Sequence, residues 1–500
     1  MYDILIRNGL VLDGTGGPGF HAQVAVKDGK IVRVARMIEG EAKQVIDAAG
    51  RVVTPGFIDS HSHSDLKFAA CPQQTEKVEQ GITTVIGGQC GGSVCGEHAA
   101  AFLDEARNAQ LGVNMGLLIG HGTLRRQVVG LDNRAATPEE QARMEELLAA
   151  AMEHGAMGVS FGLIYAPGCY ADTQELIGMA RVAARYGGVA AVHLRSEGER
   201  MVRAVDEFIT VVRASGVRGI ISHHKAGGLS ENWGKVHNTM AIVEKANGEG
   251  LDIFFDAYPY AASSSTFSGA FIPNTWRSGG VEAMLARMED PEQVAQIRAA
   301  FYAKFPNMDW MMITVCPGAP EYEGLRVGEI AALRGQDEFD AALDVVRISK
   351  GAAKCVFFSI CEQDVQAVLA NPRTMIGTDG SVGVEELKSY HPRVRGTFPR
   401  AIGRYVRQLG VVTLPEMIRK MTSMPAAVYG LAAKGLVREG MDADLCIFDP
   451  ERICDRATYT EPSLRNEGLD YVIIGGKVAA INAVATGALG GKMLYRRNER

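Results

Sequence analysis

Residues 54–65, TPGFIDSHSHSD, place two histidines one residue apart directly after a short apolar run. Residues two apart on an extended chain point to the same side, so the imidazoles of His61 and His63 can meet at one point in space. A metal ion uses such an arrangement, whereas a packed core does not. The alternative for so short a motif is a solvated loop that carries two histidines by chance. The rest of the chain has to decide between these two interpretations.

The middle of the chain alternates apolar runs with helical stretches. The expected strands are mostly apolar, as strands buried on both faces are, and they cover residues 52–58, 81–89, 114–120, 155–161, 187–194, 218–224, 252–258 and 374–379. Eight strands with intervening helices predict an α/β fold, a (β/α)8 TIM-like barrel rather than an open doubly wound sheet. A long segment separates the last two strands, so we interpret residues 266–345 as an insertion after the seventh strand, such as a lid.

Two of the helices carry clear end signals. In the helix expected from residue 138, Thr137 is the N-cap, Pro138 the first helical residue and Glu140 the partner of a capping box. The stretch 196–216 ends on Gly216, a residue that suits a helix C-cap.

Both ends of the chain differ from the middle, because they consist of short strand-like stretches separated by glycine-rich turns. The first 52 residues contain Asn8-Gly9 and Asp28-Gly29, pairs that are typical of hairpin turns. The last stretch of the chain repeats this character. We therefore expect a small β-sandwich domain built from residues 1–54 and 432–500, beside a barrel domain at residues 55–431.

Composition and charge exclude several classes of protein. The 500 residues are 47% hydrophobic and 22% charged, the balance of a globular protein with a sizeable core. The net charge of −6, without a basic run, argues against a nucleic-acid partner, and no apolar stretch suits a membrane span. The N-terminus has no signal-peptide pattern and the nine cysteines form no disulfide-like framework, so we expect a cytoplasmic location. A homo-oligomer is compatible with this composition.

Chemically active side chains follow several of the expected strands, at the end where a barrel carries its chemistry. They are His61 and His63 after the first strand, Cys90 after the second, His193 after the fifth, His223 and His224 after the sixth, and Asp379 after the eighth. Each alone has a structural explanation: a satisfied core histidine, a small buried cysteine or an Asp-Gly turn. Together they form the imidazole, thiolate and carboxylate set of catalytic zinc sites. We therefore expect a metal centre, although His121 also closes a strand and position alone is not proof.

Longer motifs resemble a known family. They are GGQCGGS, SFGLIYAPGCYA, HLRSEG, ISHHKAGG, DAYPYAASSST, IGTDGS and HPRVRGTFPR, and they are spread over nearly the whole chain. With PGFIDSHSHSD and the two strand-rich ends, they resemble the D-aminoacylase (N-acyl-D-amino-acid deacylase) family of the amidohydrolase superfamily. The combination of GQCGGS, SHHK and HPRVRGTFPR is specific, whereas His-x-His alone is weak.

The resemblance implies a metal site with named ligands. Zinc would be held tightly by Cys90, His193 and His223, with a second, weaker position at His61 and His63 that Cys90 could bridge. Many relatives in the superfamily use a carboxylated lysine as this bridge, and the matching place here has no obvious lysine. The choice of His223 over His224 stays open, because adjacent strand residues point to opposite sides and only one can face the metal.

The implied activity is zinc-dependent hydrolysis of the amide bond of a small-molecule N-acyl-D-amino acid to a carboxylate and a free D-amino acid. Zinc lowers the pKa of bound water to ~7 and polarises the amide carbonyl. Asp379 is the expected general base, which takes a proton from this water and passes it to the departing amine. Cys90 is then a ligand and not a nucleophile.

The substrate carboxylate requires a cation. The segment HPRVRGTFPR supplies three arginines, Arg393, Arg395 and Arg400. The resemblance favours Arg393, whose guanidinium fork suits a carboxylate, while ordinary solvated arginines are the alternative. Further candidates for substrate contact are Lys225, Tyr258 and Ser265. Lys225 suits an acidic substrate side chain, and it equally suits a structural ion pair.

Other functions fit the sequence less well. Another amidohydrolase, acting on a cyclic amide as hydantoinases do, or on a dipeptide, is the alternative enzyme, and the absent bridging lysine counts against it. A catalytically silent scaffold should have lost ligands, yet every expected metal position is filled. Metal storage or sensing would not need Asp379 or the arginine-rich segment after it.

Overall fold

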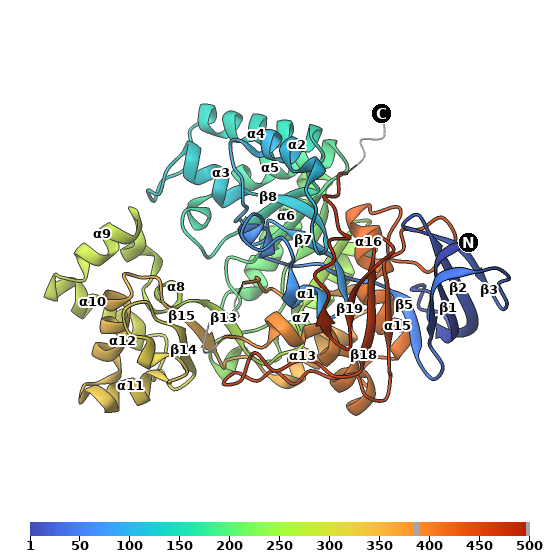
Figure 1. Cartoon of the computed structure of the whole chain (residues 1–500). Helices are drawn as coiled ribbons and strands as arrows, with labels where there is room; N and C mark the ends of the chain where they lie inside the picture. The colour runs from blue at the N-terminus through green and yellow to red at the C-terminus, as the bar shows by residue number, and fades with distance from the viewer. Residues whose placement is uncertain (384–389, 497–500) are drawn as a thin grey trace.

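Eight parallel strands form the centre of the computed structural model, which describes residues 1–383 and 390–496 (Figure 1). Along the sheet, each strand neighbours the next one in the chain, and their bounds are β6 (Phe57–Asp59), β7 (Ile82–Gly87), β8 (Asn114–Gly120), β9 (Gly158–Gly162), β10 (Val189–His193), β11 (Arg218–Ile221), β12 (Ile253–Ala257) and β16 (Thr374–Ile376). All eight overlap the predicted strands. The predicted (β/α)8 barrel is therefore confirmed.

The barrel closes between β6 and β16, its first and last strands. Single backbone contacts join the two: the Ser60 N–H donates to the Ile376 carbonyl over 3.2 Å, and the Asp379 N–H donates to the His61 carbonyl over 2.8 Å. The closure therefore brings the two histidines of the first strand beside the aspartate that follows the last one.

Helices surround the barrel, and those with clear end signals begin and end as predicted. Their bounds are α1 (Thr75–Val78), α2 (Ala99–Glu105), α3 (His121–Val128), α4 (Pro138–Glu153), α5 (Thr173–Arg185), α6 (Met201–Ser215), α7 (Lys235–Gly248), α13 (Glu362–Ala370), α14 (Arg393–Arg400), α15 (Leu414–Met421) and α16 (Ser423–Tyr429). Thr137 and Glu140 form the predicted capping box of α4, and Gly216 ends α6 with a φ of 71°.

Both chain ends contribute to one small β-sandwich, as predicted. Its strands are β1 (Tyr2–Val11), β2 (Phe20–Lys27), β3 (Lys30–Ala35), β4 (Ala42–Asp47), β5 (Val52–Pro55), β17 (Leu445–Phe448), β18 (Leu469–Ile474), β19 (Lys477–Ile481) and β20 (Val484–Ala485). The two halves meet where β5 pairs with β17 in antiparallel fashion. Apolar side chains from both halves, such as Val24 and Ile447, share one buried core.

Two local predictions at this end of the chain were wrong. Residues 52–58 are not one strand: β5 belongs to the terminal sheet and β6 to the barrel, with Gly56 between them, where a Cβ atom would lie 2.2 Å from Thr83 Cγ2. The Asn8-Gly9 pair makes no hairpin. The pairing of β1 with β2 shifts register between Ile6 and Gly9, so the pair forms a bulge inside β1. The strand then continues to Val11 beside β5. Asp28-Gly29 does connect the β2–β3 hairpin.

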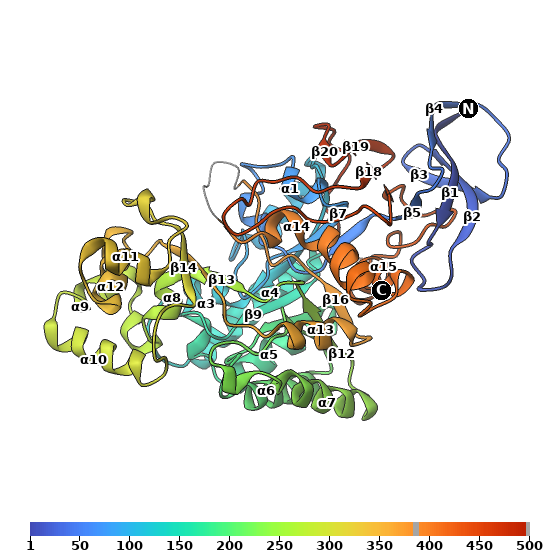
Figure 2. The same ribbon diagram turned by 90° about the horizontal axis from the view of Figure 1, so that it is seen from below.

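The segment between β12 and α13 builds a separate lobe, seen at the left of Figures 1 and 2 on the side away from β1–β3. It contains β13 (Ser263–Thr266), α8 (Phe267–Phe271), α9 (Gly280–Arg287), α10 (Pro291–Tyr302), β14 (Met311–Val315), α11 (Val327–Arg334), α12 (Glu338–Ile348) and β15 (Lys354–Phe357). Its three strands form their own sheet and its apolar residues their own core. The residues 266–345 interpreted as an insertion lie within this lobe.

Among the described residues, no helix combines the length and the apolar character that crossing a membrane requires. All nine cysteines are free thiols.

Candidate metal centre

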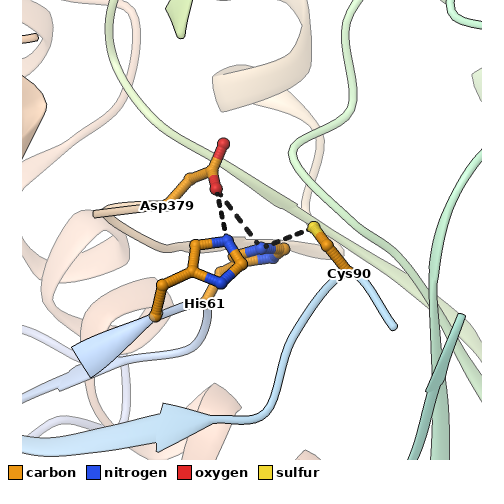
Figure 3. Close-up of side chains that lie close together, drawn as sticks. His61, Cys90 and Asp379 are labelled. Atoms are coloured by element: carbon orange, nitrogen blue, oxygen red, sulfur yellow. Dashed lines mark hydrogen bonds and ion pairs between the residues drawn. The ribbon is translucent and has the colours of Figure 1, made fainter. Parts of the chain in front are cut away.

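Four predicted side chains converge at the closure of the barrel: His61, His63, Cys90 and Asp379. Figure 3 shows the carboxylate of Asp379 and the sulfur of Cys90 approaching the imidazoles from two sides. The Asp379 Oδ1 atom lies 3.0 Å from His63 Nε2 and 3.6 Å from His61 Nε2. The Cys90 Sγ atom lies 3.3 Å from His61 Nε2.

Cys90 also belongs to a second group, with His193 and His223. Its sulfur lies 3.3 Å from His223 Nε2. One potential ligand atom of each of the three residues lies within 4.8 Å of those of the other two. Both ring nitrogens of His193 are buried and lack a hydrogen-bond partner in the described part of the chain. The five predicted ligands and Asp379 are therefore brought together as two groups that share one sulfur atom.

His223, and not His224, faces this cluster. The Nε2 atom of His224 is 2.9 Å from the hydroxyl of Thr239 on α7, outside the barrel. Burial lowers the pKa of His224 to about 3, so this imidazole is neutral. The residue pair that the sequence could not separate is resolved by the direction of the two rings.

Three of the clustered residues have a left-handed backbone, which residues other than glycine rarely adopt. The φ angles are 52° at Cys90, 36° at His223 and 46° at Asp379. Such conformations cost about 1–3 kcal/mol each and persist where the surrounding structure enforces them, most often at functional sites. The shared strain supports a common role for these three positions.

Two carboxylates, a buried one and a half-buried one, orient the imidazoles from behind, and the sequence did not assign a role to either. Asp256 on β12 lies 3.1 Å from His61 Nδ1 and accepts a hydrogen bond from the His223 N–H over 2.7 Å. Glu197 lies 3.0 Å from His223 Nδ1. A carboxylate on the second ring nitrogen fixes the orientation of a metal-binding histidine. Both residues belong to motifs that carry the family resemblance, DAYPYAASSST and HLRSEG.

The acidic groups of the cluster are held in their ionised forms. Burial raises the pKa of Cys90, but the neighbouring imidazoles of His61 and His223 outweigh burial and leave that pKa well below its usual range. Burial also raises the pKa of Asp379, and the Arg393 guanidinium and His223 bring it well below its usual range. A thiolate and a carboxylate beside several imidazoles are the donor types that zinc takes in proteins. Together with the nitrogens of His193, which have no hydrogen bond from the described residues, this donor set fits a metal ion.

The predicted substrate contacts border the cluster, but two of them already have ionic partners. Arg393 Nη1 lies 2.8 Å from Asp379 Oδ2, and Lys225 Nζ lies 2.6 Å from Glu197 Oε1. Lys225 is thus part of a structural ion pair, one of the two roles considered for it. The ring of Tyr258 contacts both cations, with the Arg393 guanidinium 4.6 Å and the Lys225 ammonium 5.7 Å from its centroid.

The hydroxyl of Tyr258 is buried and has no hydrogen-bond partner in the described part of the chain. Ser265 lies on β13 of the separate lobe, so this lobe reaches the site. Its Oγ atom is 3.4 Å from the hydroxyl of Tyr165, whose ring stacks edge-on with His193 at 4.9 Å. Tyr165 was not predicted; it lies in the motif SFGLIYAPGCYA.

Comparison with known proteins gives a consistent result. A sequence model described as "Amidohydrolase family" matches residues 44–480. The chain is 34% identical to a D-aminoacylase of Alcaligenes xylosoxydans xylosoxydans over 99% of this chain and 98% of that protein. It is 36% identical to an N-acyl-D-glutamate deacylase of the same organism, over 95% of this chain and 93% of that protein.

Solved structures give the same result as the sequence comparisons. A crystal structure of D-aminoacylase is similar with a TM-score of 0.85 and 34% identity, over 99% of this chain and all of that one. An N-acyl-D-glutamate deacylase of Bordetella bronchiseptica, in complex with zinc and a phosphonate mimic of the tetrahedral intermediate, is similar with a TM-score of 0.84, 32% identity and 99% coverage of both chains. A D-hydantoinase shares the fold, with a TM-score of 0.59 and 15% identity.

Proposed function

The chain belongs to the amidohydrolase family, and on that premise we propose that it hydrolyses the amide bond of N-acyl-D-amino acids to a carboxylate and a free D-amino acid. The observation that carries the proposal is the position of Cys90, whose sulfur lies 3.3 Å from both His61 Nε2 and His223 Nε2. A thiolate between the two ligand groups supports the role that the family resemblance gives to Cys90, a bridge in place of the carboxylated lysine of many relatives in the superfamily. The names of the two similar bacterial proteins support the class of substrate.

We propose zinc as the metal. Cys90, His193 and His223 would hold the tight site, and His61 and His63 the weaker one, with Cys90 common to both. When bound, zinc supplies Lewis acidity toward the amide carbonyl and a water of lowered pKa. The protein supplies the thiolate and, through Asp256 and Glu197, the fixed orientation of the imidazoles.

Asp379 is the proposed proton carrier. Its carboxylate is kept anionic, with Oδ1 near His63 and Oδ2 near Arg393. It accepts one proton from the attacking water and delivers this proton to the amide nitrogen as the C–N bond breaks. The second proton of this water also leaves as the new carboxyl group ionises, and the amine takes it up, so the products at neutral pH are a carboxylate and an ammonium group and the protons balance.

Arg393 is the proposed contact of the substrate carboxylate, with Tyr258 and Ser265 as further substrate contacts, and Lys225 would meet an acidic substrate side chain beside its ion pair with Glu197. The hydroxyl of Tyr258, which bonds to none of the described residues, can donate to the substrate, and both cations lie near its ring. Arg393 can contact the substrate carboxylate while it retains Asp379, because a guanidinium carries five N–H donors. The proposal therefore gives Arg393 two tasks.

Turnover by the purified, metal-analysed protein tests this function. The panel contains N-acetyl, N-formyl and N-succinyl derivatives of D- and L-amino acids, together with hydantoins and dipeptides. Activity confined to the D-acyl substrates supports the proposal. The kcat of the variant Asp379→Asn should then be about 10²- to 10⁴-fold lower, while the variant retains its metal. Activity on rings or dipeptides alone would replace it with the alternative enzyme, a hydantoinase-like or dipeptide-cleaving amidohydrolase.

A further inference from the structure

A buried lysine lies beneath the closure of the barrel, outside the group of residues that the proposed reaction uses. Lys77 on α1 is 0% exposed. Its ammonium donates three hydrogen bonds: to Asp59 Oδ2 over 2.9 Å, to Thr378 Oγ1 over 2.7 Å and to the Gly380 carbonyl over 3.1 Å. A buried ammonium is expensive to desolvate, so it persists only where its partners are complete. Here all three donors are used.

Asp59, the partner of Lys77, connects the first and the last strand. It is the final residue of β6, and its Oδ1 atom accepts hydrogen bonds from the N–H groups of Thr378, over 2.8 Å, and His61, over 3.2 Å. Its Oδ2 atom accepts the Thr378 hydroxyl over 2.7 Å. One carboxylate therefore fixes the backbone on both sides of the barrel closure.

The network encloses Asp379 from both directions along the chain. Thr378 and Gly380, the residues before and after it, both bind Lys77. The Gly380 carbonyl also accepts the His63 N–H over 3.0 Å. Between these fixed points, Asp379 has its left-handed φ of 46°. The strained backbone of Asp379 is thus enforced from its two neighbours.

We propose that Lys77 is a positioning residue for the reaction: with Asp59 and Thr378 it sets the place of the Asp379 carboxylate relative to His61 and His63. The proposal rests on the function proposed above for Asp379. β6 and β16 stand at opposite ends of the strand order, and single backbone hydrogen bonds join them in place of a regular ladder. The side-chain network adds to these few bonds and fixes the two strands to each other.

Replacement of the lysine tests the proposal. Lys77→Met keeps the approximate length of the side chain and removes the ammonium. We expect kcat to fall by about 10- to 100-fold with KM changed less than about threefold, because small misplacements of a catalytic group have effects of this size. In protein with cobalt at both positions, the visible absorption spectrum should shift as well, since the imidazoles of the weaker position, His61 and His63, are displaced relative to Cys90.

Lys434 offers a matched control. It is another buried lysine with two carboxylate partners, 2.9 Å from Asp442 and 2.5 Å from Asp444. Asp444 also bonds to Asn114, the first residue of β8, so this pair lies at the end of the barrel opposite the metal centre. Lys434→Met should lower the melting temperature and leave kcat and the cobalt spectrum unchanged.

A second pair of variants decides the matter if Lys77→Met does not fold. Thr378→Ser keeps the hydroxyl that bridges Lys77 and Asp59, whereas Thr378→Val removes it with little change of shape. We expect near-normal kcat for Thr378→Ser and, for Thr378→Val, a reduced kcat with a shifted cobalt spectrum. Folded Thr378→Val, or Lys77→Met, with wild-type kcat and spectrum would overturn the proposal.

The two proposals can fail separately. If the wild-type protein turns over none of the acyl amino acids, the proposed function is wrong. The cobalt spectra of the Thr378 variants still report whether the network sets the ligand geometry.

Discussion

Arg393 and Asp379 form a buried ion pair, with Nη1 of the arginine 2.8 Å from Oδ2 of the aspartate. The guanidinium proposed to bind the substrate carboxylate thus also holds the proposed proton carrier. Its position on the face of the Tyr258 ring fixes it from the other side. Both the proton-transfer group and the proposed carboxylate site therefore depend on one side chain.

Replacing this arginine should affect both steps of the reaction. In Arg393→Lys, the positive charge remains but the planar fork is lost, so we expect kcat/KM to fall by about 10-fold or more through both kcat and KM. Steady-state kinetics on an N-acyl-D-amino acid measure this. Arg419→Lys, in an ion pair with Glu416 on α15, is the control and should behave as wild type. A higher KM with an unchanged kcat would mean that Arg393 contacts only the substrate and does not act on Asp379.

His391 should act on the site through Arg393. The Nδ1 atom of His391 accepts a hydrogen bond from the backbone N–H of Arg393 over 3.1 Å. Its Nε2–H donates to the Ala262 carbonyl over 2.9 Å. Burial lowers the pKa of His391 well below its usual range, so the ring is neutral and can make both bonds. His391→Phe should raise KM by about 5-fold or more, since it frees the start of α14. His391→Asn should raise KM by a smaller factor, because the asparagine side chain keeps one donor and one acceptor. Equal kinetics for both variants would contradict this role.

Metal removal should expose one reactive thiol. Cys90 has a pKa well below its usual range and would be a thiolate in the metal-free protein, whereas a metal-bound sulfur reacts poorly. Titration with a thiol reagent should therefore count one more fast-reacting equivalent after treatment with a chelator. The Cys90→Ser variant should show no such difference. Rapid modification of Cys90 in the zinc-loaded protein would exclude it as a ligand.

Acid stability should depend on the ion pairs of Asp442 in the β-sandwich. Burial raises the pKa of this carboxyl, but Lys434 and Lys30 outweigh burial and lower the pKa to about 2. The unfolded value is 3.8. Because the folded pKa is the lower one, the stabilisation is complete above pH ~4 and is lost as the pH falls toward ~2. After allowance for solvent screening we expect about 1 kcal/mol.

Denaturant unfolding of wild type and Asp442→Asn at several pH values measures this contribution. The difference between the two free energies of unfolding should be constant near neutral pH and should shrink between pH ~4 and ~2. A difference that grows in acid would have the wrong sign.

The strands and most of the clustered side chains were predictable, because the carboxyl ends of parallel barrel strands meet at one face. The direction of His223 was not. In β11, Ile220 packs with the barrel interior and Ile221 with the surrounding helices, so strict alternation would turn His224 inward. The left-handed backbone at His223 breaks the alternation just after the strand ends. Sequence periodicity carries no information about such a turn.

The residues that orient the cluster were also not predictable. Lys77 and Asp59 meet Thr378 more than three hundred positions away along the chain, and this contact exists only once the barrel closes. Charged residues on a short helix such as α1 normally face solvent. Nothing in the local sequence distinguishes Lys77 from an ordinary surface lysine.

The pairing of β5 with β17 has a consequence for biosynthesis. The open edge of β5 emerges early from the ribosome, but its partner strand follows about 390 residues later, roughly 20 to 80 seconds at ~5–20 residues per second. During that interval the nascent N-terminal strands hold an unpaired edge, a template for association with other chains. Completion of this domain must therefore be among the last events of folding, and translation speed and chaperone cover over this period should influence the yield of native protein.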